Sequence, residues 1–264
     1  MAQTIACANQ KGGVGKTTTV VNLAAYLALA GEHVLIVDLD PQGNATSGFG
    51  IDRAALETTL YDVIVGDVQM ADTVLATAVD HCEIVPASVS LAGAEVKLAS
   101  TDQRERRLTR VLAPIVDRYD YILIDCPPSL GLLTVNGLTA ADSVLIPTQC
   151  EYYALEGLSQ LLKNIELIRS HLNPTLHVST ILLTMYDGRT RLSAQVADEV
   201  REHFPDQTLR ASVPRSVRIS EAPSHAETVM TYDPNSSGAL SYLEAAVELA
   251  ERGAATSSTS KESA

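Results

Sequence analysis

The chain has 264 residues, of which 46% are hydrophobic and 19% charged, a composition typical of a globular protein with one or two domains. Its formal net charge of −13 repels nucleic acid at long range, so any contact with DNA requires a local basic patch. No run of 18 apolar residues and no basic-then-apolar leader is present, and we therefore expect a cytoplasmic protein with no membrane association.

Short apolar runs alternate with helical periodicity along the chain, a pattern typical of βαβ units. The expected strands are residues 4–8, 33–38, 83–85, 121–125, 143–147, 178–183 and 209–213. Helices are expected at residues 16–30, 103–119, 154–171 and about 239–252. The pattern predicts an α/β fold, with a doubly wound, mostly parallel sheet flanked by helices in a single domain over residues 1–252. The Ser/Thr-rich residues 253–264 are expected to be a disordered tail.

A glycine-rich turn joins the first expected strand to the first expected helix. It reads Gln10-Lys11-Gly12-Gly13-Val14-Gly15-Lys16-Thr17-Thr18 and misses the plain P-loop pattern only because Gln10 replaces a glycine. The glycines let successive N–H groups converge on phosphate oxygens, and the helix that follows adds its positive end. Residues 11–18 are thus the expected phosphate site, with Lys16 on the β- and γ-phosphates and Thr17 on Mg²⁺.

Lys11 is not needed for this phosphate site. An additional cation at its mouth suggests a group that reaches the nucleotide of another subunit, as arginine fingers do. The alternative for the whole segment is a glycine-rich turn without a ligand, which the number of matching positions disfavours.

Acidic residues follow two of the expected strands, at the edge where open α/β sheets bind ligands. Asp125 fits the Walker B position, in which a carboxylate orients the magnesium shell, and Asp38 is expected at matching height on the neighbouring strand. Asp40 lies in the loop that follows and is the expected base for the attacking water, although spacing alone leaves Asp38 as an alternative. Each could instead end a strand or cap a helix.

These motifs resemble those of the ParA/MinD superfamily of P-loop ATPases, whose Walker A sequence is deviant, and most of all its Soj type. The resemblance covers roughly residues 3–250, because residues 151–157, 183–190 and 213–224 also look like Soj segments. It implies a P-loop NTPase fold that binds ATP and Mg²⁺ and hydrolyses ATP slowly.

The resemblance also implies a role in the segregation of chromosomes or plasmids. In that family two ATP-bound subunits close face to face, with the signature lysine, here Lys11, crossing to the partner's phosphates. The homodimer binds double-stranded DNA without sequence preference, and a ParB-type centromere-binding partner stimulates hydrolysis and release. The same switch can also act on the replication initiator. A protein of this kind is expected on the nucleoid.

Matched by position, the resemblance assigns residues 12–18 to the phosphate loop, Asp40 to water activation, and Asp38 and Asp125 to the magnesium shell. The residues that match the adenine site of relatives are Met185, Pro214 and Arg215.

The same resemblance assigns DNA binding to Arg189 and Arg218, which match DNA-binding positions of Soj proteins. Residues 185–220 hold six arginines and five acidic residues, whereas the rest of the chain carries nearly all the negative charge. A dimer doubles the arginines that face one duplex, so ATP-dependent dimerisation would become ATP-dependent DNA binding. The alternative for either residue is a solvated arginine. A second basic cluster holds four arginines at residues 104–110, interleaved with Asp102 and Glu105, and is expected to form a solvated face.

Four other interpretations are less well supported. A membrane-targeted MinD-like protein needs large apolar residues in a C-terminal helix, and none follows Leu249. An iron–sulfur protein needs converging cysteines, whereas Cys126 and Cys150 have no ligand spacing. A regulator that does not hydrolyse ATP has no need of Asp40. An operator-binding plasmid type carries a helix-turn-helix region ahead of the loop, where this chain has nine residues before Gln10.

Overall fold

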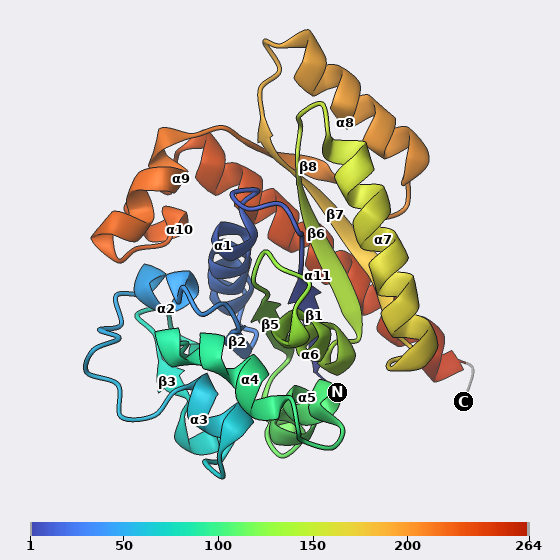
Figure 1. The fold of residues 1–264 in the computed structure, drawn as a ribbon. Helices are drawn as coiled ribbons and strands as arrows, with labels where there is room; N and C mark the ends of the chain where they lie inside the picture. Colours follow the sequence, from blue (N-terminus) through green and yellow to red (C-terminus); the bar gives the residue numbers. More distant parts are fainter. Residues whose placement is uncertain (1, 263–264) are drawn as a thin grey trace.

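The structure is a computed structural model that describes residues 2–262, with side chains described through residue 254. Its strands are β1 (Gln3–Cys7), β2 (Val34–Asp38), β3 (Leu75–Ala76), β4 (Cys82–Val85), β5 (Tyr121–Asp125), β6 (Ser143–Gln149), β7 (His177–Tyr186) and β8 (Thr208–Pro214). They form one eight-stranded sheet in the order β3-β4-β2-β5-β1-β6-β7-β8 (Figure 1). Every pairing is parallel except that of β3 with β4.

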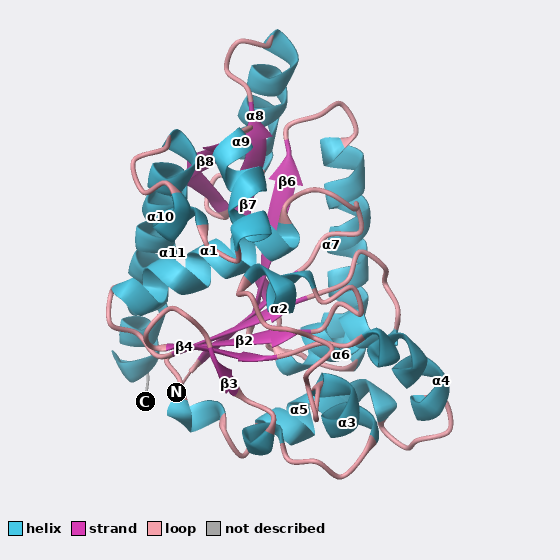
Figure 2. Ribbon diagram, turned by 90° about the vertical axis from the view of Figure 1, so that its left-hand side faces the viewer, coloured by secondary structure: helices cyan, strands magenta, loops and turns pink. Residues whose placement is uncertain are grey.

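Helices cover both faces of the sheet. They are α1 (Lys16–Leu29), α2 (Asn44–Gly48), α3 (Leu60–Val65), α4 (Ala94–Leu98), α5 (Arg107–Leu112), α6 (Leu132–Ala140), α7 (Ala154–His171), α8 (Arg191–His203), α9 (Val217–Glu221), α10 (Val229–Tyr232) and α11 (Ser237–Glu262). One apolar cluster joins the sheet to α1, α10 and α11, and the other joins it to α3 through α8. Figure 2 shows α10 and α11 on one side of the sheet and α6 and α7 on the other.

The predicted fold class is confirmed. It could be predicted because strands that are buried on both faces appear in the sequence as continuous apolar runs. In β2, Leu35 and Val37 belong to one apolar cluster, and Val34 and Ile36 to the other. The sequence analysis missed β3, whose two residues pair antiparallel at the edge of the sheet and are too short to show any alternation.

The single helix predicted at residues 103–119 is wrong. This segment is a 3₁₀ turn at Arg104–Arg106, α5, and a second 3₁₀ turn at Val116–Arg118. Pro114 follows two residues after α5 ends and has no N–H to continue the helix. The arginines here are not a simple solvated face either, because Arg107 donates to the carbonyls of Ile64 and Gly66 and ties α5 to the C-terminal end of α3.

The last helix also departs from the prediction. α11 continues to Glu262, so the backbone expected to be disordered from residue 253 is helical as far as that residue. Gly253 does not end the helix, and a Cβ added there would meet the side-chain end of Gln3. Residues 263–264 of the predicted tail lie outside the described residues. Across the described part of the chain, no helix has the length and apolar character needed to cross a membrane.

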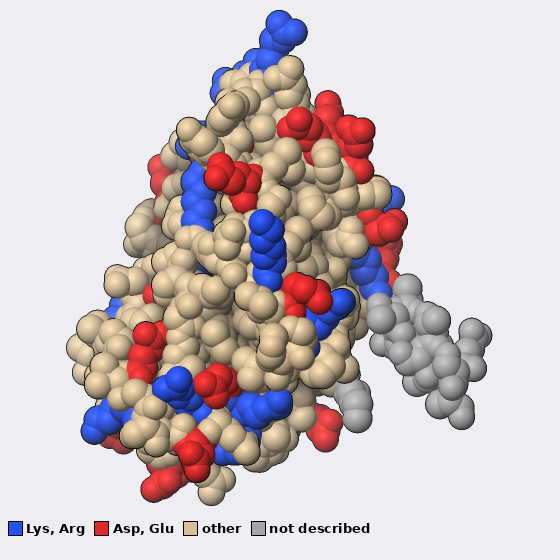
Figure 3. Space-filling model, turned by 45° about the vertical axis from the view of Figure 1, so that its right-hand side comes forward, with Lys and Arg blue, Asp and Glu red and all other residues tan. Residues whose placement is uncertain are grey.

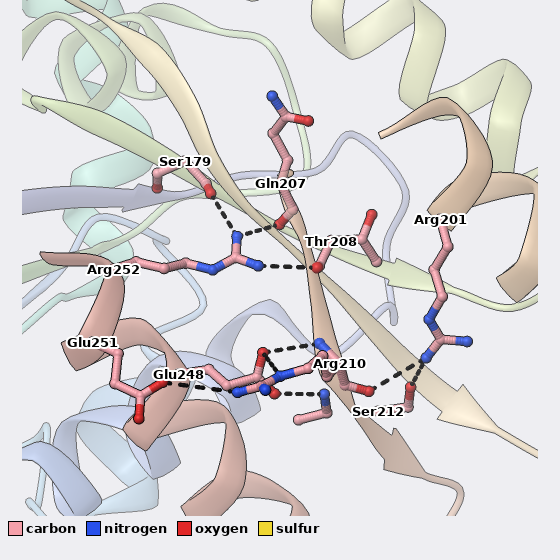
Figure 4. Close-up of polar contacts among 10 residues, drawn as sticks. Ser179, Arg201, Gln207, Thr208, Arg210, Ser212, Glu248, Glu251 and Arg252 are labelled. Atoms are coloured by element: carbon pink, nitrogen blue, oxygen red, sulfur yellow. Dashed lines mark hydrogen bonds and ion pairs between the residues drawn. The ribbon is translucent and has the colours of Figure 1, made fainter. Parts of the chain in front are cut away.

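The C-terminal helix closes the β8 edge of the sheet with polar contacts (Figure 4). The register of β7 and β8 shifts between Ile181 and Leu183, which disturbs the backbone ladder at this edge. The buried Glu248 carboxylate accepts hydrogen bonds from the N–H groups of Arg210 at 2.9 Å and Ala211 at 2.8 Å. One guanidinium on the same helix, that of Arg252, donates to three backbone carbonyls, those of Ser179, Gln207 and Thr208.

Replacement of Glu248 should therefore destabilise the fold. Glu248→Ala leaves two backbone N–H groups without their acceptor, and we expect the free energy of unfolding to fall by roughly 2–4 kcal/mol. The matched control is Glu251→Ala, which removes an exposed carboxylate 3.8 Å from Arg210 and should cost less than about 0.5 kcal/mol. Urea unfolding of the nucleotide-free protein measures both, and equal losses would contradict the role given to Glu248.

Candidate nucleotide site

The glycine-rich loop lies between β1 and α1 and bends through two glycines in the left-handed region. Gly13 has a φ of 74° and Gly15, the N-cap of α1, a φ of 91°. No side chain caps this fully described N-terminus, so its first N–H groups are free to meet an anion. From β7, Thr184 donates its hydroxyl to the Val14 carbonyl at 2.8 Å and holds the loop to the sheet.

A cavity of about 500 Å³ opens beside the loop. Among the predicted site residues, its walls include Gly12, Gly13, Gly15, Lys16, Thr17, Thr18, Asp40 and Met185. A smaller cavity of about 230 Å³ adjoins it and shares Gly15, Thr18 and Met185. Pro214 and Arg215 line this second cavity, so the residues predicted for phosphate and for adenine border one continuous depression.

The two lysines of the loop point in different directions. Lys16 is buried, and its ammonium donates to the Lys11 carbonyl at 3.4 Å, which leaves protons for phosphate oxygens. Lys11 is half exposed, is not among the residues that line the cavity, and forms an ion pair with Glu151 at 2.7 Å. Arg215 approaches the same carboxylate at 4.0 Å. The sequence analysis gave Glu151 no role, because 140 positions separate it from Lys11.

Asp38 and Asp125 lie directly opposite each other at the ends of β2 and β5 and are fully buried. Both oxygens of Asp125 and Oδ1 of Asp38 have no hydrogen-bond partner. Burial raises the pKa of Asp38 to about 6, and burial together with the nearby Asp38 carboxylate raises the pKa of Asp125 well above its usual range. A buried carboxylate is usually stabilised by hydrogen bonds from N–H and hydroxyl groups, and this pair has too few of them.

These orphaned oxygens fit a hard divalent cation such as Mg²⁺, which prefers one or two carboxylates together with water and phosphate oxygens. The described residues contain no group of three His, Cys, Asp or Glu side chains able to hold a metal by themselves. The Thr17 hydroxyl lies close enough to Asp125 to lower its pKa in part. Phosphate oxygens from a nucleotide in the loop would complete the shell.

Thr46 is a site residue to which the sequence analysis gave no role. It is fully buried on α2, and its N–H and hydroxyl donate to Oδ2 of Asp38 at 2.8 and 2.6 Å. Its hydroxyl also accepts from the Ala87 N–H at 3.0 Å. These bonds commit one oxygen of Asp38 and leave the other one free. Contact between positions eight apart arises from the left-handed turn at Gly43, which starts α2.

Asp40 lies on the loop between β2 and α2 and faces the cavity. Its Oδ1 accepts from the Gln42 N–H at 2.9 Å, and its carbonyl accepts from the Gly43 N–H at 2.8 Å. Asp38, by contrast, is not among the residues that line the cavity and is committed to Thr46. Of the two candidates for water activation, the geometry favours Asp40.

The two arginines predicted to contact DNA lie away from the buried carboxylates, and each is paired within its own chain. Arg189 precedes α8 and makes two hydrogen bonds of 2.9 Å to Asp187. Arg218 lies on α9, beside the cavity-lining Ile219, and pairs with Glu221 at 3.1 Å and Asp233 at 3.3 Å.

The buried acidic pair should make the nucleotide-free protein less stable as pH rises. Because folding raises the pKa of Asp38 from 3.8 to about 6, the folded state holds the extra proton, and stability falls between about pH 4 and pH 6. Asp125→Asn removes one charge and offers an amide donor to Asp38, so we expect a gain of roughly 1–3 kcal/mol at pH 7.5.

Urea unfolding measured from pH 4 to pH 8 without nucleotide or Mg²⁺ tests this expectation. The exposed Asp117, changed to Asn, is the control and should keep the parental pH profile. An Asp125→Asn profile parallel to that of the parent would contradict the assignment.

Comparison with known proteins agrees with the predicted fold and with the resemblance to the Soj type. A family model described as an AAA domain matches residues 2–178. The chain is 55% identical over 253 residues to the sporulation initiation inhibitor protein Soj of Bacillus subtilis, covering 96% of this chain and all of that protein. It is 50% identical over 250 residues to the chromosome partitioning protein ParA of Caulobacter vibrioides, covering 94% of each chain.

A solved structure from Mycobacterium smegmatis, described as cobyrinic acid a,c-diamide synthase with bound ADP and magnesium, has a TM-score of 0.83. It is 39% identical to this chain, and the match covers 94% of both. Identity and coverage of this extent, together with a deviant phosphate loop beside two buried strand-end carboxylates, show that the chain belongs to the Soj/ParA family of chromosome-partitioning ATPases.

Proposed function

We propose that the protein is a DNA-segregation switch, driven by ATP and Mg²⁺, which binds DNA as an ATP-bound homodimer. The observation that carries this proposal is the uncapped glycine-rich loop next to three unpartnered carboxylate oxygens of Asp38 and Asp125. A triphosphate with its cation would satisfy both halves of that arrangement at once. The ADP and magnesium in the solved relative from M. smegmatis support this pairing.

In this proposal Lys16 and the N–H groups of residues 12–18 bind the phosphates, while Thr17, Asp38 and Asp125 hold Mg²⁺. The cation would offset charge on the phosphates during transfer. Asp40 orients the attacking water and accepts its proton, which its position on the cavity wall supports. Met185, Pro214 and Arg215 enclose the adenine.

Dimerisation is proposed to occur on the surface around Lys11. Next to its ion-pair partner Glu151, Tyr152 and Tyr153 are 75% and 68% exposed, and their rings pack edge to face. Large exposed aromatic side chains are common where two proteins meet. Lys11 is half exposed and can reach a second subunit's phosphates once it leaves Glu151. The lysine would then link nucleotide state to assembly.

DNA binding is proposed to use Arg189 and Arg218, from two subunits together. With a net charge of −13 per chain, one subunit offers too few cations to hold a duplex, whereas a dimer doubles them. A ParB-type partner would stimulate hydrolysis and release, and the replication initiator is the second proposed target. These steps place the protein on the nucleoid. The partition function named for the Caulobacter relative supports this assignment.

Nucleotide-dependent DNA binding is the direct test. Asp40→Ala should retain ATP and hold the dimer, so a non-specific duplex should bind with ATP but not with ADP or without nucleotide. Binding should weaken with salt at a log–log slope of roughly −4 to −5 if about five phosphates are neutralised. Fluorescence anisotropy of a labelled duplex measures this. Lys16→Ala, the control without phosphate binding, should bind in none of the three states. Equal binding in all three would contradict the proposal.

Arg218→Glu should separate dimerisation from DNA binding. The variant reverses a charge on the proposed surface, and we expect the affinity of the ATP-bound protein for duplex DNA to fall at least about tenfold. Its dimerisation with ATP, measured by light scattering, should stay parental. Arg169→Glu is the control, because Arg169 lies on α7 and pairs with Glu166. DNA binding by Arg218→Glu as tight as that of the parent would exclude this surface.

A further inference from the structure

Six arginines lie in the segment of residues 185–220, and five of them have partners in the same chain. Arg189 pairs with Asp187, and Arg218 with Glu221 and Asp233. Arg210 pairs with Glu248 and Glu251, and Arg215 approaches Glu151. Arg201 donates to the Ser212 hydroxyl and the Arg210 carbonyl (Figure 4).

The sixth, Arg191, is exposed, and the described part of the chain offers it neither an ion pair nor a side-chain hydrogen bond. It is the first residue of α8, whose first turn carries no acidic side chain. A cation at a helix N-terminus opposes the helix dipole, so Arg191 does not stabilise α8 through its charge. Its side chain is therefore free to bind an external anion without breaking a contact.

Arg189 and Arg191 flank Thr190, the N-cap of α8, and so belong to one exposed tip of the molecule. In Figure 3, Lys and Arg side chains lie at the uppermost point of the molecule. The Arg189 side chain is 90% exposed, yet both of its hydrogen bonds to Asp187 occupy the planar fork that would otherwise bind a phosphate. Arg191 is thus available to bind a phosphate, whereas the guanidinium of Arg189 is already occupied by Asp187.

The difference matters for DNA because each phosphate contact gains from counterion release, whereas an arginine already paired with a carboxylate must exchange one anion for another. Arg189 and Arg218 both face this exchange. Asp187 is held ionised, since the Arg189 hydrogen bonds lower its pKa to about 2, so it competes for Arg189 at every physiological pH. Arg191 has no such competitor.

We propose that Arg191 is a DNA-backbone contact of this surface, available before any internal ion pair opens, and that Asp187 limits DNA affinity by holding Arg189. The inference rests on the proposed function, in which the ATP-bound protein binds DNA, and it names which cations bind and what restrains them. The occupant is the phosphate backbone of a duplex. Sequence preference is not expected, because phosphate contacts carry none.

The test measures binding of a random-sequence duplex to protein loaded with a non-hydrolysable ATP analogue, over a range of salt concentrations. Arg191→Ala should weaken binding roughly fivefold or more and reduce the steepness of the log–log salt slope by about 2 per dimer, since each subunit loses one contact. Asp187→Asn keeps an oxygen for the Arg189 N–H but releases the guanidinium, and should tighten binding roughly twofold to fivefold per subunit.

Arg169→Ala, on α7, is the matched loss of one exposed arginine and should leave the slope unchanged. All three variants should bind nucleotide as the parent does. Parental binding and slope in Arg191→Ala, or no gain in Asp187→Asn, would overturn this inference alone. Failure of the parent to bind duplex in any nucleotide state would overturn the proposed function as well. Equal, Arg191-dependent binding to phosphatidylglycerol vesicles would assign the tip to lipid instead of DNA.

Discussion

Two carboxylates buried side by side, without enough donors, are the constraint on which the rest of the site depends. Asp38 and Asp125 end adjacent strands at the same height, and three of their four oxygens have no partner. Such a pair is costly inside a protein unless a proton or a cation compensates it. The two carboxylates lie at the carboxyl ends of the strands, where the glycine-rich loop also presents free N–H groups. A cation bound at this position would therefore lower the electrostatic cost of burying the two carboxylates.

The strand order explains why these groups meet. β1 lies between β5 and β6, and the chain leaves β1 for α1 on one face while α6 and α7 cover the other. Ligands of open α/β sheets bind where neighbouring strands diverge in this way. The phosphate loop therefore emerges beside Asp125, and Asp40 follows β2 on the same side. Thr46 then couples the Asp40 loop to Asp38 through a fully buried bond.

Features written in consecutive residues could be predicted from the sequence. Buried strands appear as apolar runs, and the loop of residues 11–18 and the strand-end positions of Asp38 and Asp125 follow from local spacing. Features set by distant contacts could not. No pattern within residues 103–119 shows that Arg107 bonds the Ile64 carbonyl, and nothing near Lys11 reveals Glu151. The C-terminal helix was predicted too short, because Gly253 and the Ser/Thr-rich residues after it are typical of the start of a disordered tail.

The contacts of α11 with β7 and β8 protect the last strand of the sheet from pairing with another chain. Glu248 and Arg252 occupy backbone groups of β8 that would otherwise stand open along the last strand of the sheet. An unprotected edge strand is a template for pairing with another chain. Deleting the chain from Arg252 onwards would thus free the carbonyls of Gln207 and Thr208 at this edge and favour pairing with another chain.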